Sequence, residues 1–382
     1  MNIVVDKNIP FVLKAFAPFG EVTALPTKAI TRDAVRAADA LILRSETRVT
    51  GPFVDGSRLR FIGSASIGTD HVDLDDLAAR GIAFANAPGC NADSVKEYVA
   101  AALLHIAWMK SSSLRGTTLG IVGVGSVGRK VADMAAGLGM AVLLNDPPRA
   151  RAEGPDGFVS LDEVMAADIV TLHVPLTRTG EDATYHLFDK GRIARMKRGS
   201  ILLNTSRGAV VDSGALMQAL IDGSLGAAIL DVWEGEPYID NELLAHVLLG
   251  TAHIAGYSME GKTNAVRLVR EAFCRYFGFD APWDPAAEPP PPALREIEIG
   301  PEPSPAEEVL REAVSACYDI QIDADMLRRG AGQPAEMRAA YFRALRACYR
   351  ERREFSNITV RLPCAHAGLA APLTALGFKV TA

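Results

Sequence analysis

The sequence predicts an α/β protein with two doubly wound parallel-sheet domains and a smaller α+β domain at the C-terminal end. The chain has 382 residues, which is enough for two or three domains of ~150 residues each. Short apolar runs alternate with helical stretches as far as residue 256, as expected of parallel strands that helices cover on both faces. A proline-rich segment, 281–293, then separates the remainder, 294–382.

The first expected domain spans 1–92 and is completed by 257–280. Its apolar runs are short and continuous, which is typical of the buried strands of a flavodoxin-like sheet. A helix is expected over 11–19, where Gly20 marks its end. The expected strands are 3–5, 21–24, 40–43, 60–63 and 82–84.

The second expected domain, 93–256, follows the same alternation and predicts a second, Rossmann-like sheet. A long helix begins at Asn91 and runs past Trp108. Near its start, Ser94 and Glu97 have the spacing of a capping box. The expected strands are 118–122, 141–144, 168–172, 200–204, 227–230 and 251–254.

The last part of the chain reads differently. Prolines are so dense in 282–292 that a semi-rigid, extended linker is expected there. Strands and helices then mix without the regular alternation, which favours an α+β domain over 294–382. The expected strands are 295–299, 357–362 and 378–381, and the expected helices are 305–317, 336–349 and 366–376.

Composition excludes several classes of function. Lys+Arg number 40 and Asp+Glu 46, and the net charge of −6 argues against a nucleic-acid partner. No apolar run reaches the ~18 residues that a membrane span needs. The 5 cysteines form no CxxC pair, so neither a metal site nor a disulfide framework is expected. With Asp6 where a secretory signal would be apolar, the cytoplasm is the expected location.

A glycine-rich turn lies between an expected strand and an expected helix. In 123–128, Gly123 allows a tight turn, Gly125 lets a pyrophosphate approach the backbone, and Gly128 lets helix and strand pack closely. Ser126 and Val127 complete this turn, whose N–H groups face the phosphates. Asp146 ends the next strand, where a carboxylate binds ribose hydroxyls and repels a 2′-phosphate. NAD is therefore favoured over NADP, although Arg149 nearby would soften that preference.

Three polar side chains follow the carboxyl ends of later strands in the same sheet. They are Arg207, Glu236 and His253, and ligands of such sheets bind at that edge. This trio suits hydride transfer at a hydroxyl carbon beside a carboxylate. His253 would take the hydroxyl proton, Glu236 would fix its tautomer, and Arg207 would hold the carboxylate in a fork.

Each member of the trio has a simpler interpretation when it is considered alone. His253 could be a core histidine, Arg207 could pair with Asp212, and Glu236 could be one more surface carboxylate. Their position together at one edge, beside a dinucleotide turn, favours the catalytic interpretation. His173 also ends a strand but lies nearer the adenine side, and it is interpreted as structural.

The first domain should present its own carboxyl edge. Arg44 and Ser45 follow one expected strand, and Ser66 to Gly68 follow the next. This second segment is small and flexible, with N–H groups available for an anion, although an ordinary polar turn would look the same.

These stretches resemble the D-isomer-specific 2-hydroxyacid dehydrogenases, and the resemblance covers nearly the whole chain. The residues that carry it are 120–128, 204–208, 230–237 and 251–256. A subgroup that acts on 4-phospho-D-erythronate is the nearest match. Its more specific segments are 3–8, 43–45, 68–73, 87–91, 145–149, 253–262 and 349–354.

The resemblance implies an activity and a role for each residue. The reaction would be the NAD-dependent oxidation of 4-phospho-D-erythronate to its 2-oxo acid, 2-oxo-3-hydroxy-4-phosphobutanoate, in pyridoxal 5′-phosphate biosynthesis. Arg207, Glu236 and His253 would be catalytic. The residues that would contact the substrate are Ser45, Ser66 and Tyr257. Those that would contact NAD are the turn 123–128, Asp146, Val174, Ser206, Asp231 and Gly256. The family often has Thr at Val174, so only main-chain contact is expected there, and Ser66 replaces a more usual Thr.

The resemblance also implies a homodimer formed through the C-terminal domain. The phosphate of the substrate would need cations, and the candidates are Arg44, Lys262, Arg350, Arg352 and Arg353. One hypothesis is that an arginine of the C-terminal domain reaches the active site of the partner subunit.

Two other functions stay open. One is a different D-2-hydroxyacid dehydrogenase, such as a phosphoglycerate dehydrogenase whose C-terminal domain binds an effector. The other is an interaction protein that senses NAD(H), because such proteins can retain the trio. Production of NADH from a hydroxy acid would distinguish an enzyme from a sensor.

Overall fold

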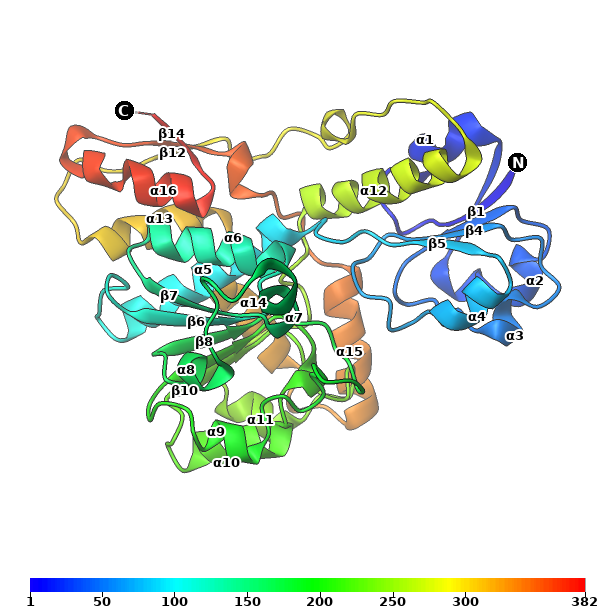
Figure 1. Cartoon of the computed structure of the whole chain (residues 1–382). Coiled ribbons are helices and arrows are strands. Elements are labelled where there is room, and N and C mark those ends of the chain that lie inside the picture. The colour runs from blue at the N-terminus through cyan, green and yellow to red at the C-terminus, as the bar shows by residue number, and fades with distance from the viewer. Residues whose placement is uncertain (382) are drawn as a thin grey trace. The chain divides into compact units, whose positions relative to one another are not determined.

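The computed structural model describes residues 1–381, and the chain divides into two compact units. Unit 1 contains Met1–Asn91 and Ser258–Pro291, and unit 2 contains Ala92–Tyr257 and Pro292–Ala382. The α/β class with parallel sheets is confirmed, and the elements are labelled in Figure 1.

Unit 1 is a parallel sheet with helices on both faces. Its strand order is β2-β1-β3-β4-β5. The strands are β1 (Asn2–Asp6), β2 (Glu21–Leu25), β3 (Ala40–Leu43), β4 (Phe61–Ser64) and β5 (Ala83–Ala85). The helices are α1 (Val12–Phe16), α2 (Arg32–Val35), α3 (Gly51–Val54), α4 (Leu74–Ala79) and α12 (Met259–Phe277).

Strand β3 shows why its residues are apolar without interruption. Ala40 and Ile42 belong to one core with Phe273 of α12, whereas Leu41 and Leu43 belong to the core on the other face, under α2 to α4. Successive side chains of a strand point to opposite faces, so both sets must be apolar when both faces are covered. Figure 1 shows α12 lying along one side of this sheet.

Unit 2 contains a second parallel sheet, in the order β11-β10-β9-β8-β6-β7. The strands are β6 (Thr118–Val122), β7 (Ala141–Asn145), β8 (Ile169–Leu172), β9 (Ile201–Asn204), β10 (Ala227–Leu230) and β11 (Leu249–Gly250). The helices are α5 (Ala92–Met109), α6 (Ser126–Gly137), α7 (Pro147–Glu153), α8 (Leu161–Met165), α9 (Lys190–Ile193), α10 (Ser213–Ile221) and α11 (Asn241–His246).

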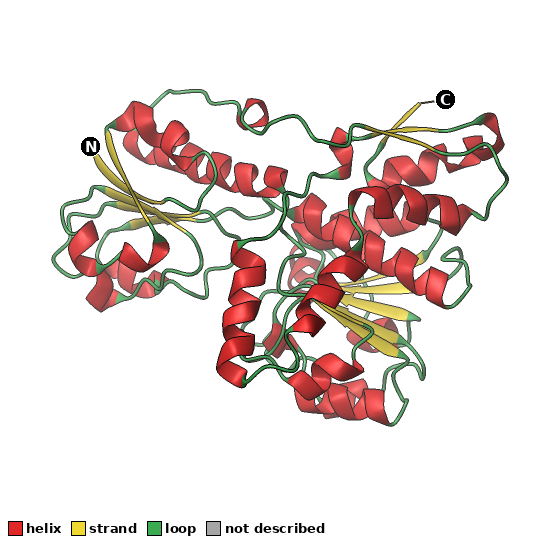
Figure 2. Ribbon diagram, turned by 180° about the vertical axis from the view of Figure 1, so that it is seen from behind, coloured by secondary structure: helices red, strands yellow, loops and turns green. Residues whose placement is uncertain are grey.

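The C-terminal region of unit 2 forms a small parallel sheet, β12-β13-β14, with its own helices (Figure 2). The strands are β12 (Glu296–Glu298), β13 (Thr359–Arg361) and β14 (Lys379–Thr381). The helices are α13 (Ala306–Cys317), α14 (Ile320–Arg329), α15 (Ala335–Ala347) and α16 (Ala370–Leu376).

This region shares a hydrophobic core with the six-stranded sheet of unit 2 and its helices. Val309, Phe355 and Leu373 lie in one cluster of buried side chains with Leu103 of α5 and Val131 of α6. The segment 294–382, which the sequence analysis treats as a domain of its own, therefore packs as part of unit 2.

Three local expectations differ from the structure. The expected strand 251–254 is a turn, because β11 ends at Gly250. The expected capping box is wrong, because α5 already begins at Ala92 and Ser94 lies inside it. Helix α14 was not predicted, although its buried side chains Ile320, Ala324 and Leu327 recur at helical spacing.

Among residues 1–381, no helix is long and apolar enough to cross a membrane. Within the same residues, no group of three or more His, Cys, Asp and Glu side chains is arranged to hold a metal ion.

Candidate active site

The glycine turn after β6 has no room for side chains at two positions. A Cβ on Gly128 would lie 2.0 Å from the Gly123 carbonyl oxygen, and Gly123 itself has a φ of +88°. A Cβ on Gly125, by contrast, would meet nothing within 4 Å, and Gly125 and Ser126 are exposed. The turn is therefore closed on its inner side and open on its outer side, which is the form of a phosphate-binding turn at a helix N-terminus.

Asp146 connects the end of β7 to this turn. Its Oδ2 accepts a hydrogen bond from the Val124 N–H at 2.8 Å, and its Oδ1 accepts one from the Arg149 N–H at 3.1 Å, as the N-cap of α7. The carboxylate therefore stands beside the glycine turn, where the sequence analysis expects a ribose to bind.

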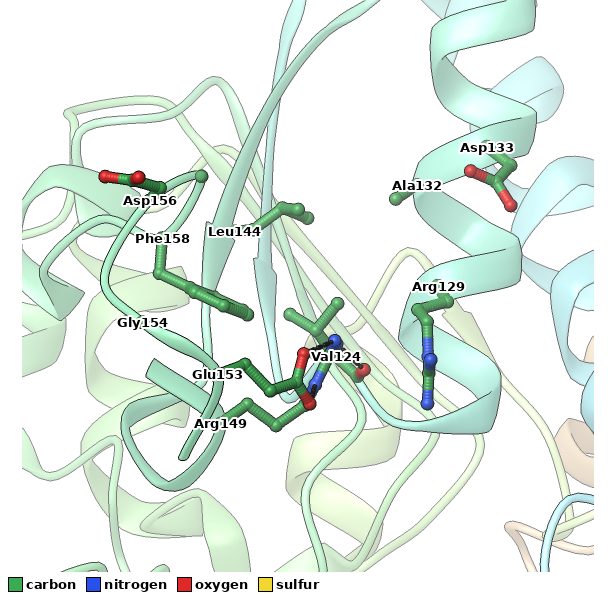
Figure 3. Close-up of a pocket in the computed structure, with 11 residues that line it drawn as sticks. Val124, Arg129, Ala132, Asp133, Leu144, Arg149, Glu153, Gly154, Asp156 and Phe158 are labelled. Atoms are coloured by element: carbon green, nitrogen blue, oxygen red, sulfur yellow. Dashed lines mark hydrogen bonds and ion pairs between the residues drawn. The ribbon is translucent and has the colours of Figure 1, made fainter. Parts of the chain in front are cut away.

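The Arg149 guanidinium is committed to contacts within the protein. Nη1 donates to the Val124 carbonyl at 2.7 Å, and Nε donates to Glu153 Oε1 at 2.7 Å. Figure 3 shows this Arg149–Glu153 pair against Val124, in a pocket of about 340 Å³. Arg149 would weaken the preference for NAD over NADP only if its pair with Glu153 opened.

Two residues beyond β8 lie against the same turn. A Cβ on Gly123 would meet Val174 Cγ1 at 2.8 Å, so Val174 packs directly on the glycine turn. His173 lies between the hydroxyls of Thr171 at 3.1 Å and Thr205 at 3.2 Å. Burial lowers the pKa of His173 to about 3, so this ring is neutral. One hydroxyl belongs to strand β8 and the other to the residue after β9, and this contact with two protein hydroxyls favours the structural interpretation.

His253 and Glu236 form a bonded pair. His253 Nδ1 and Glu236 Oε2 are 2.8 Å apart, and the Trp233 N–H donates to Glu236 Oε1 at 2.8 Å. Burial by itself would raise the pKa of Glu236, but the charge and hydrogen bond of His253, with the Trp233 N–H, hold that pKa below its ordinary value. The carboxylate is therefore ionised at neutral pH and favours a proton on Nδ1, which leaves Nε2 to exchange a proton with a substrate.

The turn that carries His253 is held by the buried carboxylate of Asp231. Oδ1 accepts from the Ile254 N–H at 2.7 Å and the Thr251 hydroxyl at 2.7 Å, and Oδ2 accepts from the Ala255 N–H at 2.9 Å. Burial raises the pKa of Asp231 in spite of these bonds and the nearby His253. His253 has a φ of 56°, in the left-handed region. The expected strand 251–254 is absent because these bonds turn the chain out of the sheet.

Arg207 follows β9, on a turn that touches the Glu236 loop. Asn204 Nδ2 donates to the Arg207 carbonyl at 2.9 Å, and Asn204 Oδ1 accepts from the Ser206 N–H at 3.0 Å. The next residue, Gly208, lies so close to Trp233 that a Cβ would be 1.9 Å from the Trp233 carbonyl carbon. The structure thus brings the Arg207 turn against the loop of Glu236, which in turn binds His253.

The expected residues of unit 1 lie at the carboxyl ends of paired strands. Ser45 is exposed after β3, and Ser66, after β4, has its hydroxyl 2.7 Å from that of Ser64. Arg44 Nε donates to the buried Asp6 at 3.2 Å. Burial and the charge of Arg44 lower the pKa of Lys262, in the first turn of α12. The substrate contacts expected of Ser45 and Ser66 stay predictions.

Sequence reasoning missed Arg346, on α15. Its guanidinium carbon is 5.8 Å from the centre of the Tyr257 ring, and its charge also acts on Glu236. The other candidate arginines of this region are engaged elsewhere, Arg350 with Asp323 and Arg352 with Glu97. The arginines of this region are visible in the sequence, but the sequence does not show that Arg346 is the one whose charge acts on the His253–Glu236 pair.

Comparison with known proteins agrees with this geometry. Residues 93–255 match the model of the D-isomer specific 2-hydroxyacid dehydrogenase NAD binding domain, and residues 290–377 match a domain of unknown function. The D-lactate dehydrogenase from Aquifex aeolicus, solved with NAD and lactic acid, is similar with a TM-score of 0.60 and 25% identity, over 73% of this chain and 96% of that one.

Full-length relatives narrow the family. Erythronate-4-phosphate dehydrogenase of Chromohalobacter salexigens is 46% identical over 100% of this chain and 99% of its own length. The protein of the same name from Salinibacter ruber is 47% identical over 94% of each chain. The chain belongs to the erythronate-4-phosphate dehydrogenases, within the D-isomer-specific 2-hydroxyacid dehydrogenase family.

Proposed function

We propose that the protein oxidises 4-phospho-D-erythronate at its C2 hydroxyl with NAD, giving 2-oxo-3-hydroxy-4-phosphobutanoate and NADH, as a step of pyridoxal 5′-phosphate biosynthesis. The observation that carries this proposal is the His253–Glu236 pair, at 2.8 Å, in the same unit as an open glycine turn. The names of full-length relatives at 46% and 47% identity supply the substrate.

The catalytic roles follow from the contacts of each side chain. Bound NAD supplies the hydride acceptor. His253 Nε2 takes the C2 hydroxyl proton, and the ionised Glu236 stabilises the imidazolium that results. Arg207 holds the substrate carboxylate with two parallel N–H donors. Tyr257 lies next to the catalytic turn and contacts the substrate chain.

The remaining proposed residues serve the cofactor. The N–H groups of the turn 123–128 hold the pyrophosphate, and Asp146 binds the ribose hydroxyls. The other proposed contacts with NAD are made by Val174, Ser206, Asp231 and Gly256. Asp231 already accepts three bonds from the protein, so its contact with NAD comes in addition to holding the turn.

Arg346 is our candidate for the substrate phosphate. Its guanidinium carbon lies 5.8 Å from the centre of the Tyr257 ring, next to the turn of His253, and its charge acts on Glu236. A planar guanidinium binds phosphate through parallel N–H donors. Arg44 and Lys262, in unit 1, stay candidates from the sequence analysis.

The proposal is tested by following NADH absorbance with 4-phospho-D-erythronate, unphosphorylated D-erythronate, 3-phosphoglycerate and D-lactate. A 2-oxo acid acceptor is added to a parallel series, so that slow release of NADH does not hide turnover. We expect the highest kcat/KM for the phosphorylated erythronate, and its ratio to D-erythronate measures the contribution of the phosphate. Higher activity with 3-phosphoglycerate would favour the other dehydrogenase, and NAD binding without turnover would favour the sensor.

Replacing Glu153 with Ala is expected to improve the use of NADP. Without Glu153, the Arg149 guanidinium can turn toward a 2′-phosphate, and the charge-assisted bond that it would form there should raise kcat/KM for NADP about tenfold. The kcat/KM for NAD should change little. Asp156→Ala is the matched control, because Asp156 lines the same pocket and removes the same charge. An equal gain in both variants would contradict a specific effect of Arg149.

We also propose that the chain forms a homodimer through its C-terminal region. Trp108 and Met109, at the end of α5, are 51% and 54% exposed, and they line one pocket with Arg311 of α13 and Ile320 of α14 in the C-terminal region. Large apolar side chains gathered at the surface are typical of contact sites. Light scattering after gel filtration should give twice the 40.7 kDa of the chain, and a monomer mass at micromolar concentration would reject the dimer.

We propose a cytoplasmic location. Cys348 and Cys364 are free thiols, and both are exposed. Exposed thiols persist in a reducing compartment. Cell fractionation with an antibody tests this, and recovery from an oxidising compartment would contradict it.

A further inference from the structure

A buried cluster of charged side chains joins the C-terminal region to the start of α5. Arg352 and Glu97 are both 1% exposed at the side chain, and Arg352 Nη2 lies 3.4 Å from Glu97 Oε2. Glu97 Oε1 accepts from the Phe355 N–H at 2.7 Å, and the Ser94 hydroxyl donates to Glu354 Oε1 at 2.9 Å. This cluster, Ser94, Glu97, Arg352, Glu354 and Phe355, is here called the Arg352 cluster.

The Arg352 guanidinium also bonds two backbone carbonyls at separate places in the chain. Nη2 donates to the Ser94 carbonyl at 2.8 Å, and Nη1 donates to the Ala255 carbonyl at 3.3 Å. The guanidinium carbon lies 3.9 Å from the centre of the Tyr318 ring. A guanidinium stacked on a ring, with its donors aimed at several acceptors, has a fixed orientation.

Those two carbonyls lie where the chain passes between its compact units. Unit 1 ends at Asn91 and resumes at Ser258, so Ser94 and Ala255 are each three residues from a passage. Ala255 is also two residues after His253. The Arg352 side chain therefore bonds two segments of unit 2, one just after the chain enters this unit and one just before the chain leaves it. The second segment is the turn that carries His253.

The turn is thus held from two directions. Its Ile254 and Ala255 N–H groups bind Asp231, whereas its Ala255 carbonyl accepts from Arg352. A second line of contacts supports the first, because the Tyr98 and Thr251 hydroxyls are 2.8 Å apart and the Thr251 hydroxyl donates to Asp231.

We propose that Arg352 is a positioning residue for the catalytic turn, so that the C-terminal region acts on the active site of its own chain. This inference rests on the proposed function insofar as the turn carries the base. It replaces the hypothesis that Arg352 binds the substrate phosphate, because the side chain is buried and both of its terminal nitrogens already bond protein carbonyls. A purely stabilising role does not account for the cluster well, since buried charges often contribute no more to stability than apolar side chains of similar volume.

The test compares Arg352→Lys with Arg361→Lys. Lysine keeps the charge at 352 but cannot present two diverging donors to Ser94 and Ala255. Arg361 is an exposed arginine of β13 in the same region, 57% exposed at the side chain. A third variant, Arg352→Met with Glu97→Gln, removes both charges and avoids leaving an unpaired buried carboxylate.

Two measurements are made on each variant. Hydrogen exchange followed by mass spectrometry reports the amides of 250–258 without any substrate, and we expect ~10-fold faster exchange in both Arg352 variants, because one anchor of the turn is lost. Steady-state kinetics should show kcat lowered ~10- to 100-fold per NAD-binding molecule, as for a slightly misplaced base, with the KM for NAD nearly unchanged. Arg361→Lys should match the wild type in both.

The outcomes separate the inference from the proposed function. If the wild type turns over the substrate and both Arg352 variants keep its kcat and its exchange rates, the inference is overturned. If the wild type is inactive with every hydroxy acid, the proposed function fails, and faster exchange in the variants still supports the positioning role. A lower melting temperature with wild-type kcat and exchange would make the cluster merely structural and would overturn the inference.

Discussion

Replacing His253 with Asn is expected to abolish most turnover and to leave NAD binding intact. The base is lost, and a general acid–base residue is typically worth ~10²–10⁴ in rate. Asparagine suits the site because His253 has a φ of 56°, a conformation that Asn adopts more readily than most residues. The backbone N–H of residue 253, which donates to the Asp231 carbonyl at 2.7 Å, is retained.

The chain supplies a matched control for this variant. His186 also has a positive φ, 48°, and its Nε2 lies 2.8 Å from Glu234 Oε1. His186→Asn therefore disrupts a second His–Glu pair of similar geometry, and it should keep kcat within a few-fold of the wild type. NAD affinity is measured by fluorescence titration and kcat by NADH absorbance. Loss of NAD binding in His253→Asn would mean that His253 supports the structure of the NAD site. An equal loss of kcat in His186→Asn would mean that the effect is not specific to the His253–Glu236 pair.

The sequence predicted the sheets well because their strands are buried on both faces. A run such as 40–43 has no polar residue and no room for one, so its pattern alone identifies a covered strand. The edge of the second sheet was predictable for the same reason, because the ends of parallel strands meet there. The Gly123–Gly128 contact follows from the spacing of the motif.

The parts that sequence did not predict depend on contacts between distant segments. Thr251 to Ile254 reads as a strand, and only the buried carboxylate of Asp231 turns it away from the sheet. Arg149 looked free to meet a phosphate, yet Glu153 and the Val124 carbonyl hold it. The Arg149–Glu153 pair has i,i+4 spacing within α7 and could have been read from the sequence, whereas the bonds of Asp231 and of the Val124 carbonyl follow from three-dimensional packing, which leaves no local pattern in one sequence.

The Arg352 cluster is the clearest case. Ser94 and Glu97 have capping-box spacing, but they bond residues about 260 positions away. Glu97 shows how strongly this environment acts, because burial raises the pKa of Glu97 above its ordinary value against the opposing charge of Arg352. The capping-box prediction failed because Ser94 and Glu97 bond the C-terminal region instead of the start of their own helix. Positions where a tertiary contact overrides a local pattern are often functional sites.

The second large effect is expected for Gly208→Ala. The new Cβ would lie 1.9 Å from the Trp233 carbonyl carbon and 2.2 Å from the Glu234 nitrogen. Both neighbours are backbone atoms, so the loop itself must move. Because the Trp233 N–H orients Glu236, this movement displaces the carboxylate from His253. Overpacking of this kind costs ~1–3 kcal/mol of stability, and a displacement of about 1 Å at the catalytic pair lowers kcat ~100-fold.

The neighbouring helix gives the control for Gly208→Ala. Gly214 lies in α10, and a Cβ there would meet only Asp212 Oδ1, at 3.5 Å. Gly214→Ala should raise the free energy of unfolding by ~0.5–1 kcal/mol, since alanine is the better helix former, and should leave kcat unchanged. Thermal melting and steady-state kinetics are measured on both variants. The two substitutions add the same methyl group six positions apart, so a difference in kcat between them isolates the contact of Gly208 with the Trp233–Glu236 loop. Wild-type kcat in Gly208→Ala would mean that Glu236 does not depend on this contact for its position.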